Sequence, residues 1–317
     1  MDLLSNLSLL RISIKDLLGR LSQVKGDMLN LFQILILSLV QATAELLPVS
    51  SSAHVIVVEK LMGLDPASPE MTFFLVMLHT GTMLAVIVYF WPRWKVLFFE
   101  GKAVSFIKMI FLATLFTGVV GLGLKKFIEK VIFRHVPHAE VEMLFRNLPL
   151  IAVALFLVGL VIIAAGRKKA PSLLLDMDEE ITSKSAVLIG MVQGLCLPFR
   201  GFSRSGATIS TALFCGISRD LAEQFSFALA VVLTPVAIFL ELHRLLKSNM
   251  FVLNGPSGLV GLLSHGIIGM ILSALTGLVA LSWLSSWLER GRWKFFGYYC
   301  LVASMVVGLL SYIHHWN

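Results

Sequence analysis

The chain of 317 residues is strongly apolar: 57% of its residues are hydrophobic, 14% are charged, and the mean hydropathy is +0.87. A soluble domain carries about 25% charged residues, and a core of this size cannot hide so much apolar surface from water. The composition therefore excludes a soluble enzyme, a disordered chain, a nucleic-acid module and a disulfide-stapled secreted domain. The net charge of +7 comes from basic residues between apolar runs, which is typical of a polytopic membrane protein.

Residues 1–28 precede the first apolar run and have a different pattern. Leucines and isoleucines recur at helical spacing, with Lys, Arg and Asp between them. This pattern predicts an amphipathic helix that lies at the membrane interface. The segment has no short apolar core with a small-residue cleavage site, so we do not expect a signal peptide.

Stretches without Asp, Glu, Lys or Arg predict the membrane-spanning helices, each of which needs about 20 mostly apolar residues. Six such stretches are present, at 71–92, 109–124, 147–166, 224–240, 248–288 and 295–317. The fifth is too long for one helix. Its segment 254–258, Asn-Gly-Pro-Ser-Gly, is predicted to be a loop that leads into the span.

Three shorter apolar pieces, at 28–44, 185–199 and 205–218, do not fit the pattern of a spanning helix. Each adjoins a charged residue together with Pro, Gly or several Ser. Non-helical backbone is tolerated at membrane depth where it lines a cavity in the protein. These pieces therefore predict two re-entrant helical hairpins.

The broken segments recur in the two halves of the chain. Pro48 and Pro198 are 150 positions apart, each shortly after a Val-Gln pair, and the same shift brings the first three spans close to the last three. We therefore expect one all-α membrane domain made of two repeats, residues 29–166 and 167–317, each with a hairpin and three spans. Because three is odd, the second repeat is inverted in the membrane, an arrangement that places a polar site inside the bilayer.

The first hairpin carries a group of side chains suited to catalysis. Gln41 and Glu45 are four residues apart and share a helix face, Pro48 ends that helix, and three serines and a histidine follow at 50–54. A carboxylate, hydroxyls and an imidazole can supply a nucleophile, a proton carrier and a metal ligand. The structural alternative is a serine helix cap, a protonated carboxyl group and a core histidine.

The second hairpin reads Pro-Phe-Arg-Gly-Phe-Ser-Arg-Ser-Gly-Ala-Thr over residues 198–208. An Arg at bilayer depth costs about 2.5 to 3.5 kcal/mol, so Arg204 is expected to face a cavity and bind an anion. Backbone N–H groups at Gly201 and Gly206, and a helix that begins near Ser205, add to a phosphate cradle. The alternative is a cytoplasmic loop with its arginines in water.

These motifs resemble those of the bacterial undecaprenyl-diphosphate phosphatase family, the bacitracin-resistance type of integral membrane phosphatase. The family elements (E/Q)xxxE, PVSSxxH and PGxSRSGAT are similar to residues 41–45, 48–54 and 200–208, and the likeness extends over about residues 30–314. Two positions depart from the pattern. Arg200 stands where the family has Pro, and Cys300 stands where many members have Arg.

The resemblance implies that the protein hydrolyses undecaprenyl diphosphate to undecaprenyl phosphate and inorganic phosphate, with a divalent cation, Mg²⁺ or Ca²⁺. This reaction recycles the lipid carrier of peptidoglycan synthesis and confers bacitracin resistance. The resemblance further implies a multi-pass protein of the bacterial cytoplasmic (inner) membrane, with its site facing the periplasm. A polyprenyl diphosphate is the expected substrate, no nucleic acid is an expected partner, and formation of a homodimer is left open.

Roles for the individual residues follow from this resemblance. The expected phosphate-binding residues are Arg204, Ser203, Ser205, Gly206, Thr208 and Ser52. Glu45 and Gln41 are the expected metal ligands, with action as a base the alternative for Glu45. Ser51 is the expected nucleophile with His54 as its base, and direct attack by His54 is the rival. The competing class is a transporter or flippase of polyprenyl phosphates, because inverted repeats with broken helices are above all a transporter architecture.

Overall fold

The computed structural model of the protein is all-helical over the residues that it describes, which are 29–66, 68–134, 147–168, 181–247 and 255–314. Six of its helices are long and apolar enough to cross a membrane. This confirms the six spans expected from the sequence. The amphipathic helix predicted in residues 1–28 lies outside the described residues.

The six spanning helices are α4 (Pro69–Phe99), α5 (Ala103–Phe127), α6 (Leu148–Gly166), α9 (Arg219–Lys247), α11 (Gly255–Glu289) and α12 (Trp293–His314). A π-helical turn, η1 (Ile128–Ile132), continues α5. Because α11 begins at Gly255, most of the loop predicted at 254–258 is helical instead. Pro256 stands in the first turn, where the N–H that proline lacks has no partner within the helix.

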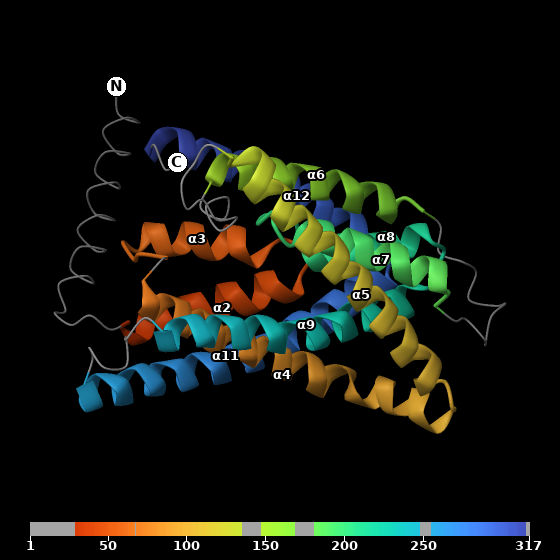
Figure 1. Cartoon of the computed structure of the whole chain (residues 1–317), viewed down its shortest axis with the longest axis horizontal. Coiled ribbons are helices and arrows are strands. Elements are labelled where there is room, and N and C mark those ends of the chain that lie inside the picture. The colour runs from red at the N-terminus through yellow and green to blue at the C-terminus, as the bar shows by residue number, and fades with distance from the viewer. Residues whose placement is uncertain (1–28, 67, 135–146, 169–180, 248–254, 315–317) are drawn as a thin grey trace.

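Four shorter helices in the described ranges form two pairs: α2 (Leu31–Leu46) with α3 (Ser51–Leu61), and α7 (Ser183–Cys196) with α8 (Arg204–Phe214). The 16 residues of α2 and the 14 of α7 extend about 24 and 21 Å, which is too short for a hydrocarbon core of about 30 Å. The two pairs lie in opposite halves of the molecule along its long axis (Figure 1). This placement agrees with the predicted re-entrant hairpins, which stay a prediction.

The turn of the first hairpin follows from its local sequence. A reciprocal capping box starts α2, in which the Gln33 N–H donates to Asn30 Oδ1 at 2.8 Å and the Asn30 N–H donates to Gln33 Oε1 at 3.0 Å. Pro48 disfavours helical backbone in the residue before it, so the helix ends there. Ser50 then adopts φ 68° and ψ 97°, a strained conformation for a residue with a side chain. As a result, Ser51 becomes the first residue of α3, opposite the end of α2.

The turn of the second hairpin depends on a glycine and a helix cap. Gly201 has φ +100°, and a Cβ at this position would lie 2.5 Å from the carbonyl oxygen of Ile151 in α6. Two residues later, the hydroxyl of Ser203 caps α8 by accepting the Gly206 N–H at 3.2 Å. Arg204 is therefore the first residue of α8, near the tip of this hairpin.

Helices from the first half of the chain pack against helices from the second half. The first hairpin packs through α2 against α11, the second packs through α7 against α5, and α6 pairs with α12. Serine hydroxyls link the helices: Ser273 of α11 donates to the Leu78 carbonyl at 2.9 Å, and Ser304 of α12 donates to the Ala152 carbonyl at 2.8 Å. Reciprocal packing of this kind agrees with two related halves. The inverted repeat itself stays a prediction.

Candidate active site

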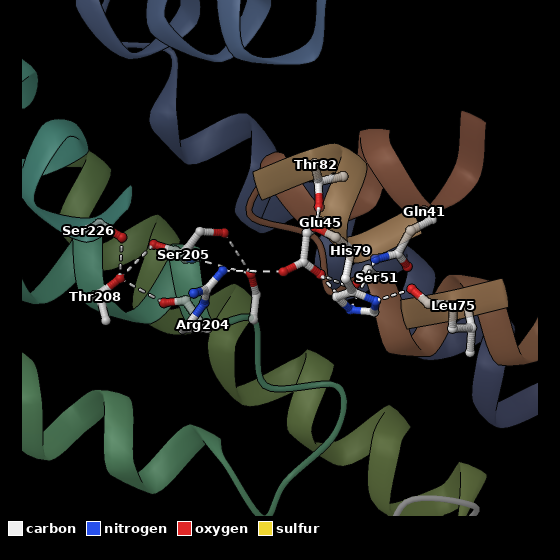
Figure 2. Close-up of polar contacts among 12 residues, drawn as sticks. Gln41, Glu45, Ser51, Leu75, His79, Thr82, Arg204, Ser205, Thr208 and Ser226 are labelled. Carbon is white, nitrogen blue, oxygen red and sulfur yellow. Dashed lines mark hydrogen bonds and ion pairs between the residues drawn. The ribbon is translucent and has the colours of Figure 1, made fainter. Parts of the chain in front are cut away.

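The two hairpins meet through an ion pair. Arg204, at the start of α8, donates from Nη2 to Glu45 Oε1 at 3.2 Å, and the two side chains are 21% and 19% exposed. The residues are 159 positions apart in the chain, so only the fold brings them together. Figure 2 shows the Glu45 carboxylate between Arg204 on one side and His79 on the other.

The second carboxylate oxygen of Glu45 binds the hydroxyl of Ser51. Ser51 Oγ donates to Glu45 Oε2 at 2.5 Å, and Ser51 is nearly buried at the start of α3. A serine hydroxyl that donates to a carboxylate is a nucleophile next to a general base. The arrangement therefore supplies two of the groups that hydrolysis by way of a covalent intermediate requires.

His79, which lies on α4, adds an imidazole to the same cluster. Its Nδ1 donates to the Leu75 carbonyl at 2.7 Å, so Nδ1 carries a hydrogen. Its Nε2 lies 3.2 Å from Nε2 of Gln41 and 3.8 Å from Glu45 Oε2. Gln41 can donate to a neutral imidazole, whereas a protonated imidazole would pair with Glu45. His79 thus connects Gln41 with the carboxylate.

Electrostatics favour an ionised Glu45. Burial raises the pKa of Glu45, but His79, Arg204 and the hydrogen bonds from Ser51 and Gln41 lower it, and the net pKa lies below the ordinary value. Glu45 belongs to α2, outside the six spanning helices. The carboxylate is therefore ready to accept a proton or to bind a cation at neutral pH. The alternative of a protonated carboxyl group in a packed interior is disfavoured.

Comparison with known proteins decides the family. The model of the family described as bacitracin resistance protein BacA matches residues 34–306, which include the candidate catalytic cluster of Gln41, Glu45, Ser51, His79 and Arg204. The chain belongs to the BacA family. The resemblance inferred from the motifs is thereby confirmed.

Curated relatives of this BacA family protein cover nearly its whole length. Undecaprenyl-diphosphatase 2 of Acinetobacter baylyi is 55% identical over 290 residues, which are 89% of this chain and 99% of the relative. Undecaprenyl-diphosphatase 2 of Burkholderia orbicola is 32% identical, over 87% of this chain and 95% of the relative. Undecaprenyl-diphosphatase of Thermodesulfovibrio yellowstonii is 30% identical, over 90% and 99%.

Several residues that the BacA motifs assign to phosphate binding hold α8 in place. The Gly206 N–H donates to Ser203 Oγ, which lies 3.4 Å from Ser205 Oγ. The Thr208 hydroxyl lies 2.8 Å from the Arg204 carbonyl and 2.6 Å from the hydroxyl of Ser226 in α9. These groups are buried and already hydrogen-bonded, whereas Arg204 faces the Glu45 carboxylate.

Ser52 also differs in placement from the catalytic cluster. Its hydroxyl lies 3.4 Å from that of Ser50, within the same turn of the first hairpin. Assignment of Ser52 to phosphate binding stays a prediction, since no contact of Ser52 with Arg204 or Glu45 is found in the described part of the chain.

Gly201, which was expected to offer its backbone N–H to phosphate, packs its backbone against Ile151 of α6 and so fixes the turn of the second hairpin.

His54 bonds groups other than Ser51 in the structure, and its expected role as the base of Ser51 stays a prediction. Its Nδ1 donates to the Ser50 carbonyl at 2.8 Å, and its Nε2 accepts from the Tyr299 hydroxyl at 2.8 Å. Burial lowers the pKa of His54, which favours the neutral ring that these two bonds require. Both ring nitrogens are therefore occupied, and Glu45 takes the position of the base next to Ser51.

Sequence reasoning did not select two residues of this region, His79 and Tyr299. His79 is an ionisable residue within the apolar stretch 71–92, which in a membrane helix is itself a functional signal. Tyr299 had no such signal, because Tyr is common in spans. At the next position Cys300, which replaces the family Arg, is buried and donates to the Pro48 carbonyl at 3.3 Å. Arg200, the other departure, is exposed in the turn between α7 and α8.

The divalent cation that the resemblance implies stays a prediction. Over the part of the chain that the structure describes, no three His, Cys, Asp or Glu side chains form a metal site of their own. Mg²⁺ is usually held by one or two carboxylates together with substrate phosphates and waters. Glu45 supplies one such carboxylate, whereas Gln41 turns its Nε2 toward His79 Nε2 at 3.2 Å, so Gln41 as a metal ligand stays a prediction.

Proposed function

We propose that this chain is an undecaprenyl-diphosphate phosphatase, which hydrolyses undecaprenyl diphosphate to undecaprenyl phosphate and inorganic phosphate. The observation that carries this proposal is the contact of Glu45 with both Ser51 and Arg204, at 2.5 and 3.2 Å. It unites a nucleophile, a base and an anion-binding guanidinium at the meeting point of two hairpins. Membership of the BacA family and the names of the relatives support the same reaction.

In the first step, Arg204 binds the diphosphate through its guanidinium and stabilises the charge that develops on the transferred phosphoryl group. Because the diphosphate competes with Glu45 for the same N–H donors, the carboxylate becomes more basic when the substrate is bound. Ser51 Oγ then attacks the terminal phosphorus, and its proton moves to Glu45. The bond from that phosphorus to the bridging oxygen breaks, and undecaprenyl phosphate leaves with the electron pair.

In the second step, water attacks the phosphorus of phospho-Ser51. The Oγ–phosphorus bond breaks, Ser51 regains a proton, and inorganic phosphate is released. Glu45 is within hydrogen-bonding distance of Ser51 Oγ and so can take a proton in the first step and give it back in the second. The same carboxylate thereby serves both halves of the reaction.

A divalent cation, Mg²⁺ or Ca²⁺, is part of this proposal. Glu45 and Gln41 would hold it together with oxygens of the diphosphate, and when bound it supplies positive charge that neutralises the phosphate oxygens. We expect that a chelator lowers the rate of phosphate release and that added Mg²⁺ or Ca²⁺ restores it. A rate that does not change in the presence of chelator would remove the cation from the scheme.

The proposal also includes the place of the protein in the cell. Six apolar helices and bacterial relatives support a multi-pass membrane protein. We propose that this membrane is the cytoplasmic one and that the catalytic cluster opens to the periplasm. In that setting the reaction recycles the lipid carrier of peptidoglycan synthesis and protects against bacitracin, in accordance with the family description. Homodimer formation and the lack of a nucleic-acid partner stay predictions.

A lipid transporter is the second candidate function, because two hairpins that meet inside a bundle are also found in transporters. Phosphate release from undecaprenyl diphosphate by purified protein in detergent separates the two functions, with Ser51→Ala as the matched control. The phosphatase proposal predicts release by the wild type alone. Well-folded wild-type protein that releases no phosphate, but moves the lipid across vesicle membranes, would favour the transporter.

A further inference from the structure

Two hydrogen bonds reach the turn of the first hairpin from α12, a helix of the other half of the chain. The Tyr299 hydroxyl donates to His54 Nε2 at 2.8 Å, and the Cys300 thiol donates to the Pro48 carbonyl at 3.3 Å. The phenol ring of Tyr299 also stacks on the imidazole, with centroids 5.6 Å apart and 15° between the ring planes. Two adjacent residues of one helix thus contact the turn from which Ser51 starts α3.

This turn contains a strained residue, so its shape needs support from the surrounding structure. Ser50 has φ 68° and ψ 97°, a costly conformation that persists only where its neighbours hold it. The Ser50 carbonyl accepts from His54 Nδ1 at 2.8 Å, so the imidazole connects this carbonyl with the Tyr299 hydroxyl. A shift of the Ser50 backbone would move the Ser51 hydroxyl, which lies 2.5 Å from Glu45 Oε2.

The supporting helix is itself held in place, because α12 packs tightly on α6 next to these two residues. A Cβ at Gly297 would lie 2.6 Å from the Gly159 carbonyl oxygen, and a Cβ at Gly159 would lie 3.1 Å from that of Cys300. Cys300 is fully buried in this contact. Such close approach of two helix backbones fixes the position of one helix along the other. As a result, α12 can hold the turn in one position.

We propose that α12 holds the turn before Ser51 and so keeps the Ser51 hydroxyl against Glu45. The inference rests on the proposed phosphatase function. Tyr299 and Cys300 are the positioning residues, the first acting through His54 and the second directly on the backbone of the turn. Neither side chain has to contact the diphosphate. Their effect is on the geometry of attack, in which a misplacement of about 1 Å can cost about 10²-fold in rate.

Two neighbouring tyrosines of α12 provide a matched test in the purified full-length protein, with farnesyl diphosphate as substrate. Tyr298 packs against Phe295 of its own helix. In Tyr299→Phe, which keeps the ring and loses the hydroxyl, we expect kcat to fall about tenfold while KM stays within about twofold. Tyr298→Phe should keep both constants within about twofold. A kcat for Tyr299→Phe within twofold of the wild type, or an equal fall in Tyr298→Phe, would overturn the inference.

A double replacement tests whether Tyr299 acts through His54. Two residues that act along one route give effects that do not multiply, whereas independent residues give effects that do. In a His54→Ala background, Tyr299→Phe should therefore change kcat by less than about twofold. A further tenfold fall in that background would overturn the route through the imidazole.

The thiol of Cys300 allows a rescue test. Cys300→Ala removes the donor to the Pro48 carbonyl, whereas Cys300→Ser keeps a donor at the same place. We expect kcat of the alanine variant to lie at least about threefold below that of the serine variant, with similar KM values. Equal kcat values in the two variants would overturn the role of Cys300.

A last measurement does not depend on turnover. Hydrogen exchange of a peptide that spans residues 47–58 is followed by mass spectrometry, since loss of a supporting hydrogen bond increases local opening. We expect exchange at least about threefold faster in Tyr299→Phe than in the wild type, and unchanged in Tyr298→Phe. Equal exchange in the wild type and Tyr299→Phe would overturn the support by α12. If wild-type protein released no phosphate while exchange rose in Tyr299→Phe, the phosphatase function would fail and the support of the turn would stand.

Discussion

Glu45 contacts each of the groups on which the proposed reaction depends. Ser51 and Arg204 bind its two oxygens, and His79 lies within ion-pair distance. A buried carboxylate is costly unless it is paired, so each of these partners also stabilises the ionised form. In the proposed reaction Ser51 is therefore the nucleophile, Glu45 is the base, and His79 adjusts the basicity of Glu45.

Replacement of Ser51 tests the nucleophile. In Ser51→Ala we expect the rate of phosphate release to fall by at least about 10³-fold, because loss of a nucleophile removes the covalent route. Ser52→Ala is the matched control, and it should lose less than about tenfold, since its hydroxyl contacts Ser50 rather than Glu45. Equal losses in the two variants would show that the contact with Glu45 does not select the nucleophile.

Replacement of His79 tests the electrostatics of the base. His79 lowers the pKa of Glu45, so in His79→Ala that pKa should rise. A carboxylate must be ionised to act as a base, and activity should then be lost at a higher pH as the solution is acidified. The pH profile of kcat/KM measures this shift. Thr80→Ala, one position away, should leave the profile unchanged. An acid limb that stayed in place in His79→Ala would contradict the role of His79.

At the scale of the element, two short turns position the side chains of Ser51 and Arg204. The strained backbone of Ser50 places Ser51 at the start of α3, and the positive φ of Gly201 places Arg204 at the start of α8. The breaks between α2 and α3 and between α7 and α8 could be predicted, because Pro48 and the charges beside short apolar runs are visible in the sequence. The identity of the base could not be predicted, since Ser51 and His54 are three residues apart on one helix and their spacing suggests a pair. Our proposal of Glu45 rests on its contact with Ser51, while the hydroxyl of Tyr299 in α12 bonds His54 Nε2 at 2.8 Å.

Two glycines with positive φ test the second turn. Gly201 and Gly216 both have positive φ, where a residue with a side chain is strained. Replacement by Ala should therefore lower the free energy of unfolding by about 1 to 3 kcal/mol at each position. At Gly201 a Cβ would also meet the carbonyl of Ile151, whereas at Gly216 there is open space. We therefore expect Gly201→Ala to have a lower melting temperature and a weaker phosphatase activity than Gly216→Ala. Equal melting temperatures would contradict the close packing of this turn on α6.

At the scale of the whole molecule, the two hairpins lie in opposite halves of its long axis (Figure 1). Each hairpin packs against a span that comes from the other half of the chain. The stretches without charged residues allowed the six spanning helices to be predicted, and the short apolar pieces beside Pro, Gly and Ser allowed the broken segments to be predicted. The partners across the molecule, such as α2 with α11, could not be read from apolar runs, because all spans have similar composition. The catalytic cluster thus depends on long-range packing that local patterns do not encode.

The inverted repeat is tested by the side of the membrane on which its loops lie. Three spans separate residues 65 and 169, so cysteines placed at these positions should react with a membrane-impermeant thiol reagent from opposite sides. The exposed native Cys215 is first replaced by Ser in this background. The proposed orientation predicts that position 65 is labelled from the periplasm and position 169 from the cytoplasm. Labelling of both from one side would contradict the inverted arrangement.

Trapping of the phosphoenzyme tests whether Ser51 attacks the diphosphate while Glu45 accepts its proton. Wild-type protein is mixed with a prenyl diphosphate labelled in its terminal phosphate, quenched, and the modified residue is found by mass spectrometry. We expect a phosphate on Ser51 that survives mild acid and is lost in alkali. A phosphate on His54 that is lost in acid and survives alkali would contradict this expectation.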